Sequence, residues 1–223
     1  MNNETRLPRV VLVGFNKCAT RSFANLFAAA GHPSIHHKIR HFLKSTNIAK
    51  VVQQNLESGK KAFHGIEDYI FYGDLIYQSK TECFEAYLHF REILRDYPDT
   101  IFILNLRNRE DWIRSRANHG HGEFMARTMK AHGFNAQEEC KDYWRKLWDT
   151  HINDVRAHMA NLPGQLVEFN IDTDDIQTLV DALPAYHLDK RAWEDHGRSR
   201  NRNNKSMTNR LKRIWSHIRP RNY

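Results

Sequence analysis

The stretch Val10–Ser22, VVLVGFNKCATRS, decides the fold of this 223-residue chain. It opens with four consecutive aliphatic residues, and the run stops at Gly14. A short apolar run closed by a turn residue predicts a strand buried on both faces, as in a parallel sheet. A helical pattern follows over residues 21–30, and Gly31 closes it. The stretch therefore predicts a strand, a loop and a helix in direct succession.

The loop between this strand and this helix has the composition of an anion site. The first N–H groups of a helix have no acceptor within the helix, and the helix dipole is positive at that end. Lys17 adds a full charge to the loop, and Thr20 adds a hydroxyl group. We expect a phosphate or a phosphate-like group as the ligand. The ATP-binding pattern GxxxxGK[ST] is absent, because no glycine precedes Lys17 and no Ser or Thr follows it.

The positive charge of the chain is concentrated near its C-terminal end. The net charge is +8, and residues 197–223 contain nine basic residues and no acidic ones. We therefore expect one α/β domain over residues 1–196, followed by a basic tail over residues 197–223 that is helical in its later part. Such a tail suits an anionic partner, which includes a nucleic acid, an anionic membrane surface, an acidic substrate and an anionic cofactor.

Several classes of protein are disfavoured by composition. No stretch reaches the roughly 18 apolar residues of a membrane span, and the opening MNNETRLPR has no apolar segment of a signal peptide. The three cysteines, Cys18, Cys83 and Cys140, have no metal-ligand spacing. We expect a cytoplasmic protein without a metal site. We interpret Cys18 as a small loop filler, in preference to a thiol of lowered pKa.

The rest of the chain alternates between further strand and helix patterns. We expect strands over residues 34–37, 61–65, 100–106 and 165–169. We expect helices over residues 46–56, 81–97, 137–160 and 172–183, and a looser stretch over residues 119–133.

A second junction of this kind lies where the strand over residues 100–106 ends. Arg107 follows the strand directly, and Asn108 is a natural N-cap for the helix after it. Ser115 lies about two turns along that helix. Ligands of open α/β sheets bind outside the carboxyl ends of the strands, so we expect Arg107 and Lys17 to share one crevice. There Arg107 can hold a second phosphate by paired hydrogen bonds, with a hydroxyl from Ser115.

The first junction resembles the phosphosulfate-binding loop of sulfotransferases, whose pattern is roughly K-x-G-T-[TS] between strand and helix. Lys17, Thr20 and Ser22 match this pattern in kind and spacing. Ala19 stands where glycine is usual, and Arg21 stands where threonine is frequent. We expect Ala19 to forbid a positive φ at little other cost.

The second junction resembles the sulfotransferase segment R-[DN]-P-x-x-x-x-x-S, which holds the 3′-phosphate of the cofactor. Arg107 and Ser115 match it in spacing, whereas Arg109 replaces the usual proline. The strand and helix over residues 165–183 also resemble sulfotransferases. The resemblance therefore runs from residue 10 to residue 183. It implies a three-layer α/β sandwich with a central, mostly parallel sheet and a P-loop-like strand–loop–helix anion site.

The resemblance also implies an activity. It is the transfer of a sulfuryl group from 3′-phosphoadenosine 5′-phosphosulfate to a hydroxyl or amine of a small-molecule or carbohydrate acceptor, with 3′-phosphoadenosine 5′-phosphate as the product. Lys17 would neutralise charge on the bridging oxygen, and Arg198 would lie in a late basic segment that closes over the cofactor. The implied cofactor-binding residues are Lys17, Ala19, Thr20, Arg21, Ser22, Arg107, Ser115 and Arg198. No metal is required, because lysine and the helix dipole supply the positive charge.

An acceptor hydroxyl also needs a base within hydrogen-bond reach. Asp74 lies in a place that resembles the T-H-L-P histidine of cytosolic sulfotransferases, and we favour it as the catalytic base. His37, directly after the expected second strand, is where other branches place a Glu or a His, and it ranks second. Glu67 ranks third.

Two other functions stay open. One is a P-loop-like nucleotide or small-molecule kinase, but the Walker glycine and the Mg-binding hydroxyl are missing. The other is a non-enzymatic protein that binds an anion or a nucleic acid through the basic tail, which leaves the paired anion sites unexplained. We favour the sulfotransferase, with no nucleic-acid partner and with peripheral contact between the tail and an anionic membrane as an option.

Overall fold

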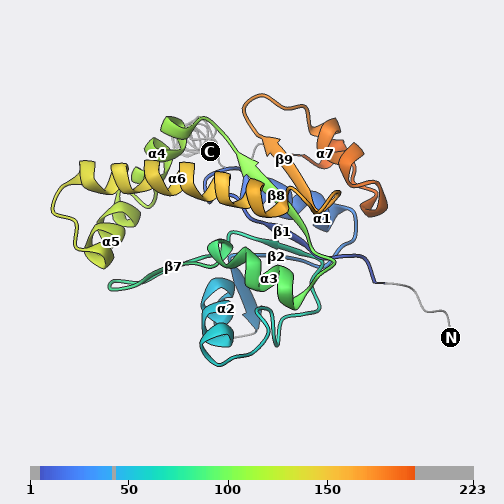
Figure 1. The fold of residues 1–223 in the computed structure, drawn as a ribbon, viewed down its shortest axis with the longest axis horizontal. Coiled ribbons are helices and arrows are strands. Elements are labelled where there is room, and N and C mark those ends of the chain that lie inside the picture. Colours follow the sequence, from blue (N-terminus) through green and yellow to red (C-terminus); the bar gives the residue numbers. More distant parts are fainter. Residues whose placement is uncertain (1–5, 42–43, 194–223) are drawn as a thin grey trace, which may run out of the picture.

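A computed structural model describes residues 6–41 and 44–193 of the chain. Its centre is a five-stranded sheet in the order β2-β5-β1-β8-β9, and the neighbouring strands are parallel (Figure 1). The strands are β1 (Val10–Leu12), β2 (Ser34–His36), β5 (Phe71–Gly73), β8 (Ile101–Leu106) and β9 (Leu166–Asn170). The expected α/β class with a central parallel sheet is confirmed.

Helices cover both faces of this sheet and complete the three layers (Figure 1). The helices on one face are α1 (Thr20–Ala29) and α7 (Ile176–Ala182). Those on the other face are α2 (Ile48–Glu57), α3 (Phe90–Asp96), α4 (Arg109–Ala117), α5 (Glu123–His132) and α6 (Gln137–Met159). Successive side chains of β1 point to opposite faces of the sheet and contribute to both hydrophobic cores. Val10 packs on the face covered by α1 and α7, and Val11 packs on the other face.

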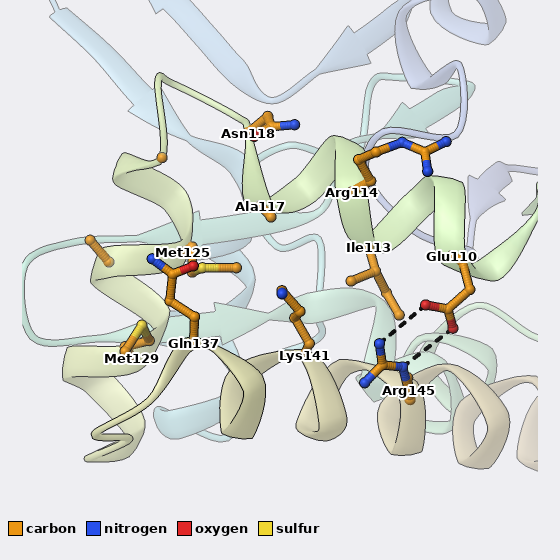
Figure 2. Close-up of a pocket in the computed structure, with 12 residues that line it drawn as sticks. Glu110, Ile113, Arg114, Ala117, Asn118, Met125, Met129, Gln137, Lys141 and Arg145 are labelled. Atoms are coloured by element: carbon orange, nitrogen blue, oxygen red, sulfur yellow. Dashed lines mark hydrogen bonds and ion pairs between the residues drawn. The ribbon is translucent and has the colours of Figure 1, made fainter.

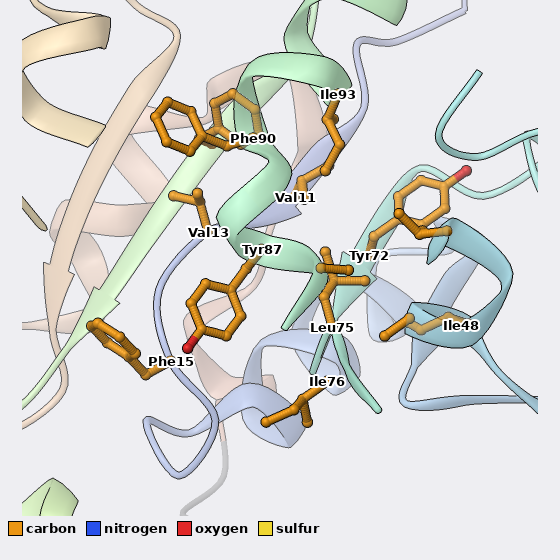
Figure 3. Packing of buried hydrophobic residues seen from close by; sticks show 14 of the residues in the cluster. Val11, Val13, Phe15, Ile48, Tyr72, Leu75, Ile76, Tyr87, Phe90 and Ile93 are labelled. Atoms are coloured by element: carbon orange, nitrogen blue, oxygen red, sulfur yellow. The ribbon is translucent and has the colours of Figure 1, made fainter. Parts of the chain in front are cut away.

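The core under α2, α3 and α6 is rich in aromatic rings. Figure 3 shows Tyr87 and Phe90 packed beside the aliphatic side chains that β1 presents to this face. Phe15, at the start of the loop after β1, stacks on Trp148 of α6 with ring centroids 4.4 Å apart. Each fully buried side chain of this kind contributes about 1.5–3 kcal/mol to folding. The loop after β1 is therefore anchored in the core at its first residues.

Two short antiparallel hairpins were not expected from the sequence. One joins β3 (Lys38–His41) to β4 (Lys44–Asn47) and follows β2 directly. The other joins β6 (Ile76–Gln78) to β7 (Cys83–Glu85) and follows β5. Because β4 takes up Thr46, the helix expected from residue 46 begins at Ile48, and Asn47 caps it by accepting a hydrogen bond from the N–H of Lys50.

The helix expected over residues 81–97 was wrong in its first half. The segment forms β7 and a 3₁₀ turn, and α3 begins only at Phe90. The reason is Glu85, which is buried and forms an ion pair with the fully buried Arg116 of α4. The guanidinium group of Arg116 also lies over the rings of Trp112 and Trp144, at 5.0 and 5.1 Å from their centroids. Removing one member of a buried ion pair typically costs about 3–5 kcal/mol, so this pair holds the segment extended.

Three smaller expectations also need correction. The looser stretch over residues 119–133 contains α5, because Gly122 and Gly133, both at positive φ, bracket the helix instead of breaking it. Residues 62–65 form turns and not a strand, with the N–H of Ile66 bonded to the carbonyl of Phe63. The helix expected over residues 172–183 begins at Ile176 and not at residue 172, since Asp175 provides its N-cap.

Within the described residues, no helix is long and apolar enough to cross a membrane.

Gly14 lies where the chain leaves β1 and passes β8 at close range. A Cβ atom at this position would lie 2.7 Å from the backbone nitrogen of Asn105 and closer still to its oxygen atoms. We predict that Gly14→Ala lowers the free energy of unfolding by about 3 kcal/mol, because the backbone of a central strand cannot move aside. Urea denaturation measures this loss.

The matched control is Gly164→Ala. Gly164, unlike Gly14, has a positive φ, at 79°, and a Cβ there would meet no atom within 4 Å. Its expected loss is about 1 kcal/mol, from backbone strain alone. Equal losses for the two variants would contradict the close approach of the Gly14 loop to β8.

Candidate active site

The residues that follow β1, β2, β5 and β8 meet at the carboxyl edge of the sheet. His36 of β2 pairs with Gly73 of β5, so the next residues of the two strands, His37 and Asp74, lie side by side. The backbone N–H of His37 donates to the carbonyl of Gly73 at 3.1 Å. The topology thus brings together the two residues that ranked first and second as the base.

Asn105 of β8 binds the loop after β1 from inside the molecule. Its side chain is buried, and its amide nitrogen donates to the carbonyls of Phe15 at 3.0 Å and Cys18 at 2.8 Å. Both ends of the loop are therefore tied to one side chain of the central sheet.

Two further side chains bind carbonyls of the same loop. The indole N–H of Trp112 in α4 donates to the carbonyl of Asn16 at 3.0 Å. The Nε2 atom of His151 in α6 donates to the carbonyl of Val13 at 2.7 Å. Because these loop carbonyls are engaged toward the protein interior, the loop can turn its opposite, N–H-bearing side to a ligand. This is the arrangement of a backbone anion site.

The start of α1 completes the anion site. Its N-cap, Ala19, has φ 56° and makes no side-chain capping hydrogen bond, and Lys17 has φ 68°. The expectation that Ala19 forbids a positive φ was wrong. The hydrogen bonds that hold the flanking carbonyls impose the left-handed conformation, at a strain of about 1–2 kcal/mol.

Arg107 comes to this loop from the end of β8. Its Nη1 atom donates to the carbonyl of Lys17 at 3.2 Å, and its Nη2 atom lies 3.8 Å from Oδ1 of Asp172. Its Nε atom is buried and makes no hydrogen bond to any described residue. Arg107 therefore lies against the loop that carries Lys17, so the two strand-to-helix junctions meet at this edge of the sheet. Ser115 lies in α4, as expected, and its side chain is half-buried.

His119, two residues after the end of α4, lies beside Lys17. The Nζ atom of Lys17 donates to Nδ1 of His119 at 3.4 Å. The sequence interpretation assigned no role to His119, although the HGHG stretch was visible. The glycines of that stretch have positive φ values, which turn the chain back toward the loop after β1.

Asp74 sits among histidines. Its Oδ2 atom lies 3.3 Å from Nδ1 of His37 and 3.9 Å from Nε2 of His36. Burial by itself would raise the pKa of Asp74, but the nearby imidazoles of His37, His36 and His119 lower that pKa below its ordinary value. Asp74 is therefore a carboxylate at neutral pH. Asp74 and His37 both have positive φ, at 56° and 64°, and such strain is often found at functional sites.

Other candidates from the sequence lie elsewhere. Glu67 precedes β5 and lies toward the opposite edge of the sheet, where its carboxylate accepts from the N–H of Gly65 at 2.7 Å. Burial raises the pKa of the Cys18 thiol, which fits a loop filler and not a reactive thiolate. Arg198 and the rest of the basic tail lie outside the described residues. Across residues 6–41 and 44–193, no three His, Cys, Asp or Glu side chains gather in a way that could hold a metal ion.

A cavity of about 550 Å³ lies between α4, α5 and α6 (Figure 2). Its apolar side chains include Ile113 and Met125, and its charged side chains pair with one another or with neighbours. Figure 2 shows the ion pair between Glu110 and Arg145, with Nη2 of Arg145 3.2 Å from Oε2 of Glu110. None of the residues expected in the site lines this cavity.

The family model for a sulfotransferase domain matches residues 9–130, more than half of the chain. The chain belongs to the sulfotransferase family. The matched span contains both strand-to-helix junctions and the histidines around Asp74. No curated protein shows significant similarity to this sulfotransferase.

The supports of the loop were not found from the sequence. Asn105 carried one visible signal, since it is a polar residue inside the apolar strand pattern ILNL. His151 lies on a helix among aromatic residues and carried no signal of its own. Trp112 matches the tryptophan that often precedes the serine of the sulfotransferase segment, but that match did not indicate a contact with the loop. His36 was read as part of the second strand, although its position at the carboxyl end of a parallel strand could have marked it.

The strained Ala19 gives a stability test. We predict that Ala19→Gly raises the free energy of unfolding by about 0.5–1 kcal/mol, because glycine adopts φ 56° without a Cβ clash. Chemical denaturation measures the change. The matched control is Ala28→Gly, at an exposed position within α1, which should lower stability by about 0.8–1 kcal/mol. Destabilisation by both substitutions would contradict the left-handed conformation of Ala19.

Proposed function

We propose that this sulfotransferase uses 3′-phosphoadenosine 5′-phosphosulfate as its donor and a hydroxyl or amine of a small-molecule or carbohydrate acceptor. The meeting of two strand-to-helix junctions supports this donor. Each junction supplies one cationic side chain, Lys17 or Arg107, which suits a ligand with two anionic ends. The buried Nε atom of Arg107 makes no hydrogen bond to any described residue. Its N–H group can donate a hydrogen bond to a phosphate oxygen. This pairing is the observation that carries the proposal.

Each end of the donor would have its own set of residues. The loop and first turn of α1 would hold the 5′-phosphate through N–H and hydroxyl groups. The residues of this set are Ala19, Thr20, Arg21 and Ser22. Arg107 and Ser115 would hold the 3′-phosphate, and Arg198 would add a charge from the basic tail. When bound, the donor supplies an activated sulfuryl group.

Lys17 would stabilise the negative charge that develops on the leaving phosphate. Reactions of this type have loose transition states, so positioning and charge stabilisation supply most of the rate. Lys17 is fixed from both sides for this role, because its carbonyl is bound by Arg107 and its Nζ atom is bonded to His119. A positioned lysine needs no reorganisation when the charge appears.

We propose that His37 is the base that takes the proton of the acceptor, and that Asp74 orients the His37 ring. An anionic carboxylate of lowered pKa is a weak base, so Asp74 is poorly suited to take the proton itself. With a proton on Nδ1 of His37 facing Asp74 at 3.3 Å, Nε2 of His37 keeps its lone pair. The His37 side chain is 38% exposed, which leaves that nitrogen accessible to an acceptor. This assignment reverses the order in which the sequence ranked the two residues.

We further propose a cytoplasmic location, which the three free cysteine thiols support.

The first test of this function concerns Lys17. We predict that Lys17→Ala lowers the rate of sulfuryl transfer by roughly 10²–10³-fold, because a preorganised charge at a developing anion is lost. A transfer assay with labelled donor and a panel of acceptors measures the rate, and Lys60→Ala, an exposed lysine remote from the crevice, is the control. Activity within threefold of wild type in a folded Lys17→Ala variant would overturn the assignment.

The second test separates the two phosphate sites. We predict that Arg107→Ala weakens the binding of adenosine 3′,5′-bisphosphate roughly ten- to a hundredfold, and the binding of adenosine 5′-phosphate much less. Ser115→Ala should show the same preference at a smaller size, because a neutral hydroxyl contributes less. Calorimetry with both ligands measures the difference.

The control for the second test is Arg114→Ala on the same helix. Arg114 is exposed and pairs with Asp111, so its loss should change neither affinity. Equal losses for the two ligands in Arg107→Ala would mean that Arg107 only supports the loop through the carbonyl of Lys17.

A further inference from the structure

Thr20 and His36 form a hydrogen bond that none of the roles above requires. Thr20 opens α1, and His36 ends β2. The Oγ1 atom of Thr20 lies 3.0 Å from Nε2 of His36, and both side chains are partly buried. The same Nε2 atom lies 3.9 Å from Oδ2 of Asp74. One ring nitrogen of His36 therefore faces both the proposed phosphate site and the proposed proton-accepting pair.

The hydroxyl of Thr20 has a single hydrogen to give. A phosphate anion offers only acceptor oxygens, so Thr20 can bind it only by donating that hydrogen. Thr20 must then accept a hydrogen from His36, which requires a proton on Nε2. With the proton on Nδ1 instead, Nε2 of His36 would take the hydrogen of Thr20 and leave the hydroxyl with nothing to donate.

The carboxylate of Asp74 favours the proton on Nε2 of His36 even without a ligand. Burial lowers the pKa of His36, and the negative charge of Asp74 offsets this only in part. The ring is therefore neutral at physiological pH and carries one proton. Asp74 is anionic and lies on the Nε2 side of the ring, where it attracts that proton.

We propose that His36 is a positioning residue that holds the hydroxyl of Thr20 as a hydrogen-bond donor toward the 5′-phosphate group. This inference rests on the proposed function, in which Thr20 binds that phosphate. His36 touches neither the phosphate nor the acceptor, and it acts through Thr20. It also links the two halves of the site, because Asp74 orients His37 on one side and faces the proton of His36 on the other.

The tautomer of His36 can be measured in the protein without any ligand. Long-range ¹⁵N–¹H correlation NMR distinguishes a histidine protonated on Nε2 from one protonated on Nδ1. We expect the Nε2 form for His36 at neutral pH, with its signal assigned by loss in His36→Gln. A neutral ring protonated on Nδ1 would overturn the proposal.

Calorimetry with adenosine 3′,5′-bisphosphate tests the action through Thr20. We expect His36→Leu to weaken binding about fivefold, the usual size for one neutral hydrogen bond. His36→Gln should restore most of the affinity, because its amide nitrogen can occupy the place of Nε2. His36→Asn, whose amide is too short to reach that place, is the matched control and should not restore it.

A double-mutant cycle separates positioning from support of the fold. In a Thr20→Val background, His36→Leu should change the affinity by less than twofold, because the hydroxyl through which it acts is gone. The same fivefold loss in both backgrounds, or no loss in either, would overturn the proposal. If the wild-type protein does not bind the bisphosphate, the proposed donor is wrong, and the NMR tautomer still decides the state of His36.

Discussion

The site depends on hydrogen bonds that run from the sheet and helices to the carbonyl oxygens of the loop after β1. Asn105, Trp112, Arg107 and His151 bind five carbonyls between Val13 and Cys18. A polypeptide loop has as many donors as acceptors, and it binds an anion only if its acceptors are satisfied elsewhere. The interior side chains meet that condition. They also explain how the loop tolerates Lys17 and Ala19 at positive φ. The hydrogen bonds to these five carbonyls fix the backbone, although non-glycine residues disfavour positive φ.

Strain is concentrated where the strands end. Of the non-glycine residues with positive φ in the described part of the chain, Lys17, Ala19, His37 and Asp74 all lie at the carboxyl edge of the sheet. Such conformations persist only when surrounding contacts determine them. Here the contacts are the paired carbonyls of the loop and the parallel pairing of β2 with β5. The polar groups of the site are consequently fixed before any ligand binds, which favours a reaction that depends on positioning.

Sequence patterns correctly predicted those helices and strands whose conformation depends on residues close by in the sequence. The apolar runs of β1 and β8, the cap at Asn108 and the closing Gly31 depend on neighbouring residues, and these expectations agree with the structure. The segment over residues 81–97 failed because its conformation depends on the buried partner of Glu85, thirty-one residues away. In the site, the approach of Arg107 to the loop of Lys17 followed from sheet topology, whereas Asn105, Trp112 and His151 act across 87 to 138 residues of sequence. A pattern of a few residues carries no information on such contacts.

The bond from His151 to the carbonyl of Val13 bears on where this protein could be shortened. The stretch that matches the family model ends at residue 130, before α6 begins at Gln137. A fragment cut at that boundary would keep every group proposed to touch the donor except Arg198. It would nevertheless lose the imidazole that binds Val13 and the indole of Trp148 that covers Phe15. The end of the family match at residue 130 is therefore not the end of the folded domain. The loop after β1 has its full set of hydrogen bonds and ring contacts only when α6 is present.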